Sequence, residues 1–158
     1  MAAIRTTLIS LILLCACAAA AQARRVVSLM PSYTEIIFAL GAGGDLVGVS
    51  SFCNWPPEVQ KIEKAGDYLR PNVEKVYSLK PDIVFTGAWA EVKPANEMAA
   101  LGIKVLRLPP EGRTADIFTT IRLIAAELGR AEKGEKLVAA LRASLPAVKA
   151  GKKIKVYI

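Results

Sequence analysis

The chain has 158 residues, a formal net charge of +7 and no histidine. Without an imidazole base, catalysis by a Ser-His or Cys-His pair is excluded, and imidazole-based zinc or manganese sites are disfavoured. The basic residues are scattered, often beside acids, and their one cluster, at Lys152, Lys153 and Lys155, has no interleaved aromatic side chains. We therefore expect no nucleic-acid partner.

Residues 1–23 have the layout of a secretory signal peptide. Arg5 precedes an apolar core from Leu8 to Leu14, and an alanine-rich segment then leads to Ala21-Gln22-Ala23. This order of charge, apolar core and small residues is typical of a cleaved signal, and the core is short for a membrane span of about 20 apolar residues. We expect a secreted protein that begins at Arg24, with a form lipid-anchored through Cys17 as the alternative.

Removing the signal leaves one cysteine, Cys53, and enough residues for a single domain with a sizeable core. An exported protein with a lone cysteine is not a disulfide scaffold. Free cysteines are most often buried, so we expect a buried thiol here. A bond to a cysteine outside this chain and a contact with a ligand are the alternatives.

Four apolar segments predict the strands of a parallel sheet. Residues 25–30 and 46–50 form the first two, and the third, Ile83-Val84-Phe85, is the continuous apolar run of a strand buried on both faces. Residues 103–108 alternate apolar and basic side chains, which places the fourth strand nearer the sheet edge. With helices between the strands, the pattern predicts an α/β, Rossmann-like lobe in which a parallel sheet is flanked by helices.

The first helix is predicted from a capping box formed by Ser32 and Glu35. Each side chain would accept a hydrogen bond from the other residue's backbone amide, which starts a helix that runs through Leu40. The glycines of residues 41–44 follow this helix. A helix C-cap and turn therefore explain them better than a dinucleotide-binding fingerprint, which needs its glycines between a strand and a helix.

A short helix follows Asn72, a natural N-cap. Its apolar face carries Val73, Val76 and Tyr77, and Pro81 ends it. Glu74 lies on the water side of the first turn, where the helix dipole favours an anion. The sequence thus predicts an exposed carboxylate at this position.

Two more helices are predicted, from about Pro94 to Gly102 and from about Thr114 to Gly129, before a last one from Glu132 to Lys149. Pro146 is expected to kink or fray its last turn. Four residues mark its apolar side: Leu137, Leu141, Leu145 and Val148. Residues 151–158 then predict a strand, which either pairs with the same sheet or opens a second domain.

The loop of residues 51–57 follows the second strand and contains Phe52, Cys53 and Trp55. It would form the wall of a cleft at the carboxyl ends of parallel strands, where open α/β sheets bind ligands. Alternatively, its aromatic side chains fold back on the core.

Several spaced motifs together resemble one family. They are Arg25 to Glu35, Gly48-Val49-Ser50-Ser51-Phe52, Trp55-Pro56-Pro57, Asn72 to Val76, Leu79 to Val84 and Leu101 to Val105. In this order they are similar to the periplasmic cobalamin-binding proteins, which belong to the iron-siderophore and cobalamin receptor group of ABC importers. The resemblance extends from Arg25 to Ile158.

The resemblance implies two α/β lobes joined by a long helix, with the ligand held between them. It divides this chain into a signal peptide (1–23), an N-terminal α/β lobe (24–130), an interlobe helix (131–150) and the first strand of a truncated second lobe (151–158). On this resemblance, we expect that the rest of the second lobe is missing from the chain. The expected protein is periplasmic and a monomer, and its partner is an ABC permease.

The resemblance also assigns roles to single residues. Glu74 falls on the family's first-lobe docking glutamate, which meets arginines on the permease. Phe52 falls where the family has a ligand-contacting tyrosine, and Tyr68 where it has a tryptophan. Both keep a flat ring for a corrin macrocycle.

The loop with Ser32 and Tyr33 lines the same cleft by resemblance. A third family aromatic falls on Gly87, which is a departure from the pattern, although Trp89 offers a substitute two residues later. The expected ligand is cobalamin or a related corrinoid. Haem or an iron-siderophore is the alternative, since tyrosine ligates haem iron and the positive net charge suits anionic siderophores.

We thus predict a substrate-binding protein and not an enzyme. An enzyme using paired carboxylates on a glycoside is a less favoured alternative, whose activity would depend on Cys53 or Asp67. A sensor subunit that docks through Glu74 is another.

Overall fold

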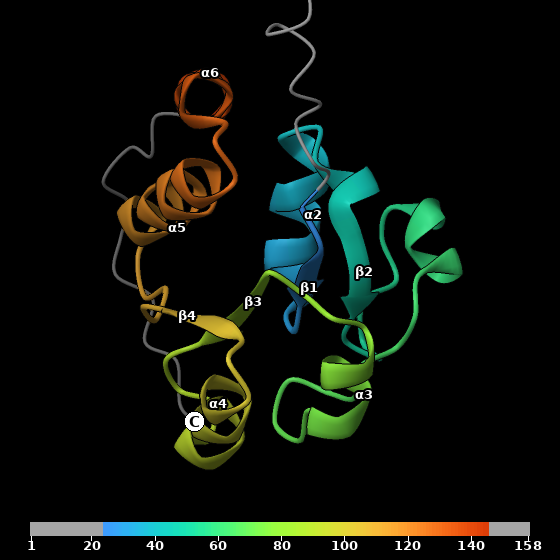
Figure 1. Cartoon of the computed structure of the whole chain (residues 1–158). Coiled ribbons are helices and arrows are strands. Elements are labelled where there is room, and N and C mark those ends of the chain that lie inside the picture. The colour runs from blue at the N-terminus through green and yellow to red at the C-terminus, as the bar shows by residue number, and fades with distance from the viewer. Residues whose placement is uncertain (1–23, 146–158) are drawn as a thin grey trace, which may run out of the picture.

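The computed structural model describes residues 24–145 (Figure 1). Its four strands form one parallel sheet in the order β2-β1-β3-β4. They are β1 (Val26–Ser28), β2 (Leu46–Val49), β3 (Ile83–Gly87) and β4 (Lys104–Leu108). The chain pairs β2 on one side of β1 and then crosses to β3 and β4 on the other, which is the doubly wound topology. All four predicted strands and the edge position of β4 are confirmed.

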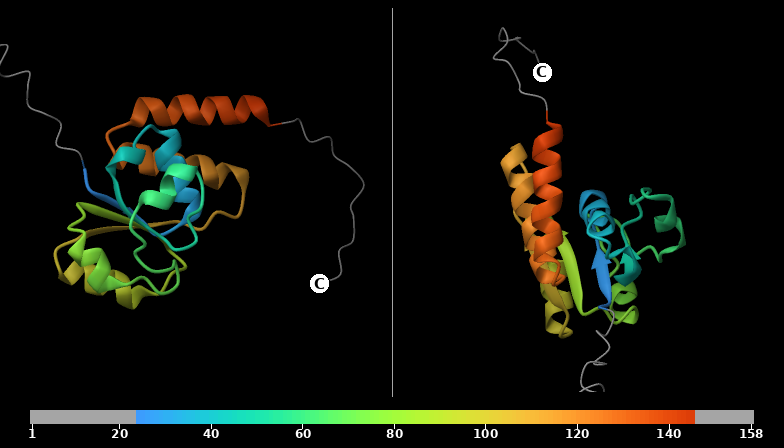
Figure 2. Two further views of the ribbon diagram at one scale, coloured as in Figure 1. Left: turned by 90° about the vertical axis from the view of Figure 1, so that its right-hand side faces the viewer. Right: turned by 90° about the horizontal axis from the view of Figure 1, so that it is seen from above.

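Helices cover both faces of the sheet (Figure 2). The first face carries α2 (Pro31–Ala39), α5 (Thr114–Glu127) and α6 (Ala131–Ser144). The second face carries α3 (Val73–Ser78) and α4 (Val92–Ala100). Two short 3₁₀ turns, η1 (Gly43–Asp45) and η2 (Pro57–Lys61), complete the described elements. The arrangement is the expected α/β sheet between helical layers.

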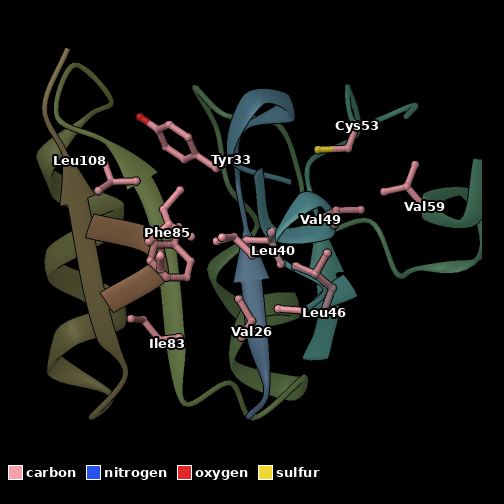
Figure 3. Packing of buried hydrophobic residues seen from close by; sticks show 14 residues of the cluster. Val26, Tyr33, Leu40, Leu46, Val49, Cys53, Val59, Ile83, Phe85 and Leu108 are labelled. Carbon is pink, nitrogen blue, oxygen red and sulfur yellow. The ribbon is translucent and has the colours of Figure 1, made fainter. Parts of the chain in front are cut away.

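Alternate side chains of the central strands enter the two cores. Val26 and Phe85 pack in one cluster with Leu40 (Figure 3). The same cluster includes Ile124 of α5. The neighbours of Val26 and Phe85 in sequence point to the second face, where Val27 meets α3 and α4 residues. Burying each such side chain contributes about 1.5–3 kcal/mol, so the continuous apolar runs are explained by burial on both faces.

The predicted Ser32–Glu35 capping box is wrong. The helix begins at Pro31 with Met30 as N-cap, and no side chain caps it. Proline suits the first helical position because its φ is already helical and it has no amide to satisfy, so the helix starts one residue earlier than the box requires. Ser32 then lies inside the first turn, and its Oγ is buried without a hydrogen-bond partner in the described part of the chain.

The short helix α3 begins as predicted. The Asn72 Oδ1 accepts a hydrogen bond from the Lys75 amide at 2.8 Å, and the helix ends at Ser78, before Pro81. Tyr77, however, is 54% exposed, so its predicted place on the buried face is wrong. The buried stripe of this six-residue helix is narrow, with Val76 at its centre, and Tyr77 lies off it.

The predicted apolar side of α6 is only partly correct. Leu137 is partly buried, but Leu141 and Leu145 are exposed. Gly134 and Val138 are buried instead, because a Cβ on Gly134 would lie 2.5 Å from the Ala125 Cβ and the glycine lets α6 approach α5 closely.

The described helix ends at Ser144, and Leu145 is extended, as expected for a residue before proline. Val148, the predicted helix end, the strand of residues 151–158 and the signal peptide of residues 1–23 lie outside the described residues. Between residues 24 and 145, no helix is long and apolar enough to cross a membrane.

Candidate functional site

Three aromatic side chains meet where the loops leave the carboxyl ends of the strands. Phe52 follows β2, Trp89 follows β3, and Tyr68 comes from the loop before α3. The ring centroids of Phe52 and Tyr68 are 5.3 Å apart with planes tilted by 51°, and those of Tyr68 and Trp89 are 5.3 Å apart in an edge-to-face arrangement of 77°. We call these three residues the aromatic row.

The aromatic row is accessible. Phe52 is 57% exposed and Trp89 is 44% exposed, while Tyr68 between them is half-buried. Exposed aromatic rings carry a large apolar surface that is favourable to cover. The three rings pack against one another, and no part of the chain among residues 24–145 covers them, so the row is a candidate surface for an apolar, flat-sided ligand.

Hydrogen bonds join the loops that carry Phe52 and Tyr68. The Ser51 side chain and amide both donate to the Gly66 carbonyl at 2.8 Å. The Phe52 amide donates to the Ser50 Oγ at 3.3 Å. These bonds link the end of β2 to the start of the Tyr68 loop, so the two rings are held by a shared backbone network.

The Tyr68 loop is a tight turn set by its neighbours. The Asp67 Oδ1 accepts from the amides of Leu69 at 2.7 Å and Arg70 at 2.6 Å, which is the local bonding that aspartate favours in turns. Gly66 has a φ of +96°, and a Cβ there would lie 2.5 Å from the Asn72 amide nitrogen. Only glycine fits this position. Asp67 thus shapes the loop that presents Tyr68.

The position of Trp89 depends on Gly87 and on Arg107 of β4. A Cβ on Gly87 would lie 2.5 Å from the Trp89 Nε1, so the indole occupies the space that a side chain at position 87 would need. Arg107 Nη2 donates to the carbonyls of Ala88 at 2.6 Å and Ala90 at 2.7 Å, on either side of Trp89. Sequence reasoning missed Arg107, because only the strand pairing places it beside this loop.

Ser32 and Tyr33 do not join the aromatic row. Both lie in the first turn of α2 and not in a loop. Tyr33 is 1% exposed inside the core cluster (Figure 3), and burial, with a smaller effect of the Glu111 carboxylate, raises the pKa of its hydroxyl to about 12. Three of the five predicted ligand residues are therefore brought together. The ligand contacts of all five stay predictions, and burial argues against Tyr33.

Apart from the aromatic row, a hollow of about 480 Å³ lies between α2, α5, α6 and the Trp55-Pro56 segment. Ser32 lines it together with apolar residues such as Ile36 and Leu141. Trp55 is 61% exposed there. Neither Phe52 nor Trp55 folds back on the core, which favours the interpretation of their loop as the wall of a binding surface.

Cys53 is a free, buried thiol, as predicted. Its Sγ lies 3.2 Å from the Thr34 Oγ1. Burial is the largest effect on the thiol and raises its pKa above the ordinary value, so the reactive thiolate is suppressed. Cys53 is thus the residue by which the Phe52 loop packs into the core, and burial favours the protonated form of its thiol.

Glu74 is exposed in the first turn of α3, as predicted. The neighbouring Lys75 pairs with Glu63 at 2.7 Å, and within residues 24–145 no ion pair holds Glu74 itself. The carboxylate is therefore presented to solvent just after the Tyr68 loop. Over the same residues, no group of three or more His, Cys, Asp or Glu side chains could hold a metal ion.

Comparisons with known proteins agree on one family. A model described as "Periplasmic binding protein" matches residues 26–153. The vitamin B12-binding protein of Salmonella typhimurium is 39% identical over 135 residues, which cover 82% of this chain and 49% of that protein. An uncharacterized ABC transporter substrate-binding lipoprotein of Bacillus subtilis, YvrC, is 37% identical over 127 residues, which cover 78% of this chain and 40% of that protein.

A solved structure agrees with the sequence relatives. The periplasmic heme-binding protein RhuT of Roseiflexus sp. RS-1, in its apo form, superposes with a TM-score of 0.73 and 32% identity over 77% of this chain and 47% of that one. The chain thus spans about half the length, or less, of these relatives. On its fold, its sequence and the length of the match, the chain belongs to the periplasmic binding protein family.

Proposed function

We propose that this chain is the N-terminal lobe of a substrate-binding protein of an ABC importer, and that its ligand is cobalamin or a related corrinoid. The observation that carries the proposal is the aromatic row, in which two exposed rings and the half-buried Tyr68 ring, from separate loops, pack together at the carboxyl edge of the sheet. Ligands of open α/β sheets bind at this edge. The vitamin B12-binding protein of Salmonella typhimurium supports the choice of a corrinoid.

Haem is the second candidate ligand. It is also a large planar macrocycle that covers aromatic rings, and a tyrosine is among its possible iron ligands. The heme-binding neighbour of known structure supports this alternative. The two ligands differ at the metal, because haem iron would recruit the Tyr68 hydroxyl, whereas a corrinoid needs only the face or edge of the ring.

Titration of the complete purified protein tests the proposal. Isothermal titration calorimetry with cyanocobalamin, haemin and a ferric siderophore should give the strongest binding with cyanocobalamin. Phe52→Ala should weaken it about tenfold, since an aromatic contact contributes about 0.5–1.5 kcal/mol beyond the area it buries. Tyr77→Ala, which removes an exposed ring outside the row, is the matched control and should have no effect.

Two results would overturn parts of this proposal. If the protein bound none of the three ligands, the proposed binding function would be excluded. A preference for haemin that is lost in Tyr68→Phe would replace the corrinoid with haem, because that substitution keeps the ring and removes only the hydroxyl.

We propose further that Glu74 docks on the permease. Charge reversal by Glu74→Lys should abolish binding to a purified vitamin B12 ABC permease, measured by surface plasmon resonance, and should leave cyanocobalamin affinity unchanged. Glu132→Lys reverses an exposed charge in the first turn of α6 and serves as the control. If Glu74→Lys lost the ligand and kept the permease, the assignment of Glu74 would be wrong.

A further inference from the structure

The loop that carries Trp89 is bound to strand β4 along its backbone. The Ala88 amide donates to the Leu108 carbonyl at 2.7 Å, and the Ala90 amide donates to the Gly87 carbonyl at 3.1 Å. The first bond continues the pairing of β3 with β4, and the second closes a tight turn around Trp89. The backbone on both sides of this residue therefore depends on the sheet.

Arg107 adds a second connection at the same place. It faces Thr86 across the β3–β4 pair, and its Nη2 reaches over the strand ends to the carbonyls of Ala88 and Ala90. Hydrogen bonds from a charged donor are about twice as strong as neutral ones. One nitrogen of a rigid guanidinium thus connects the two residues that flank Trp89 to a paired strand.

The environment of the guanidinium favours this geometry. Arg107 is half-buried, and its Nε is buried without a partner within residues 24–145. A buried donor without a partner costs free energy, and the two bonds from Nη2 to the loop offset part of that cost. The position of Arg107 thus connects β4 to the loop through the two short bonds of its Nη2.

The indole itself is packed on two sides. Gly87 leaves the space that it fills, and Tyr68 meets it edge-to-face. Neither contact holds the backbone of the loop, however. If the turn at Ala88–Ala90 opened, both contacts would be lost together.

We propose that Arg107 is the positioning residue that holds Trp89 in the aromatic row, and that it thereby contributes to ligand affinity without touching the ligand. This inference depends on the proposed function for its effect on affinity. A side chain that is ordered before binding costs less conformational entropy when the ligand arrives. Loss of Arg107 therefore weakens binding through Trp89 alone.

The first measurement needs no ligand. The chain has two tryptophans, so the Trp55→Phe variant reports on Trp89 alone. In that background, Arg107→Ala should raise acrylamide quenching of Trp89 fluorescence about twofold, since a released loop opens more often, and Arg107→Lys should restore part of the protection. Lys104→Ala, which removes a basic side chain on the same strand and its pair with Glu127, should leave quenching unchanged.

The second measurement is a double-mutant cycle on cyanocobalamin affinity, by calorimetry and without the Trp55 change. Trp89→Ala should weaken binding about tenfold and Arg107→Ala about threefold. In the Trp89→Ala background, Arg107→Ala should have no further effect, because the two residues act as one unit.

The results separate the possible failures. Unchanged quenching in Arg107→Ala would overturn the positioning role, as would an equal loss of affinity with and without Trp89, which indicates general destabilisation. If the wild-type protein bound neither cyanocobalamin nor haemin, the proposed function would fail and the quenching data would still decide the role of Arg107. Where Arg107→Ala does not fold, as judged by far-UV circular dichroism, Arg107→Lys carries the same comparison.

Discussion

The burial of Tyr33 leads to a specific prediction about alkaline stability. Burial raises the pKa of its hydroxyl from 10.0 to about 12, so the folded protein keeps this proton at pH values where the unfolded chain has lost it. Between the two pKa values the folded state binds more protons, and the free energy of unfolding falls as pH rises. Tyr33 therefore contributes stability below pH 10 that is lost between about pH 10 and 12.

The magnitude follows from the shift. Each pKa unit corresponds to about 1.4 kcal/mol, so about 1.4 kcal/mol is lost by pH 11 and about 2.7 kcal/mol in total. Tyr33→Phe removes the ionisable group and keeps the ring. The variant should therefore lose about 1.4 kcal/mol less than the wild-type protein between pH 9 and pH 11.

Urea denaturation followed by far-UV circular dichroism at both pH values measures this difference. Tyr77→Phe makes the same chemical change at an exposed position and should follow the wild-type protein. Parallel loss of stability in wild-type and Tyr33→Phe proteins would refute the reasoning and indicate that the Tyr33 hydroxyl is solvated. A solvated hydroxyl would in turn restore Tyr33 as a candidate ligand contact.

Two further substitutions test the loops and helix of the site. Gly87→Ala should displace the Trp89 indole, because the new Cβ would lie 2.5 Å from its Nε1. In the Trp55→Phe background, the emission maximum of Trp89 fluorescence should therefore shift. Gly44→Ala, with no atom within 4 Å of the new Cβ, is the control and should leave the emission maximum unchanged. Asn72→Ala removes the N-cap of α3 and should lower the free energy of unfolding by about 1 kcal/mol in urea denaturation. Asn72→Asp keeps a side-chain acceptor and should retain the wild-type stability. An unchanged stability of Asn72→Ala would show that the cap contributes nothing.

Much of the fold could be predicted because its signals are local. A strand buried on both faces must be apolar throughout, so Ile83 to Phe85 was recognisable, and the Asn72 cap acts within a single turn. The errors arose where two local signals competed or where packing decided. Pro31 started its helix ahead of the Ser32 box, and the narrow buried stripe of α3 left Tyr77 in solvent.

The site shows the same division. Phe52 is indicated by its place in the loop after the second strand and by the family resemblance, whereas Tyr68 is assigned by the resemblance alone. The complementarity of Gly87 and Trp89 depends on how the indole folds back over its own strand, which residue spacing does not encode. Arg107 lies about twenty residues from the loop that it binds, and its role requires the register of β3 with β4.

The geometry of the aromatic row also limits what it can do alone. Binding sites bury 70–90% or more of a ligand's surface, whereas a row of exposed rings on one sheet edge covers a flat ligand from one side. Strong binding therefore requires a second surface opposite the row. The matched part covers 40% and 49% of the two relatives, so each relative has more than half of its length left to form such a surface. Under the proposed function, the row contacts the ligand's flat, apolar surface in that arrangement. Glu74, exposed on α3 just beyond the Tyr68 loop, then stays free to contact the proposed permease while the ligand is bound.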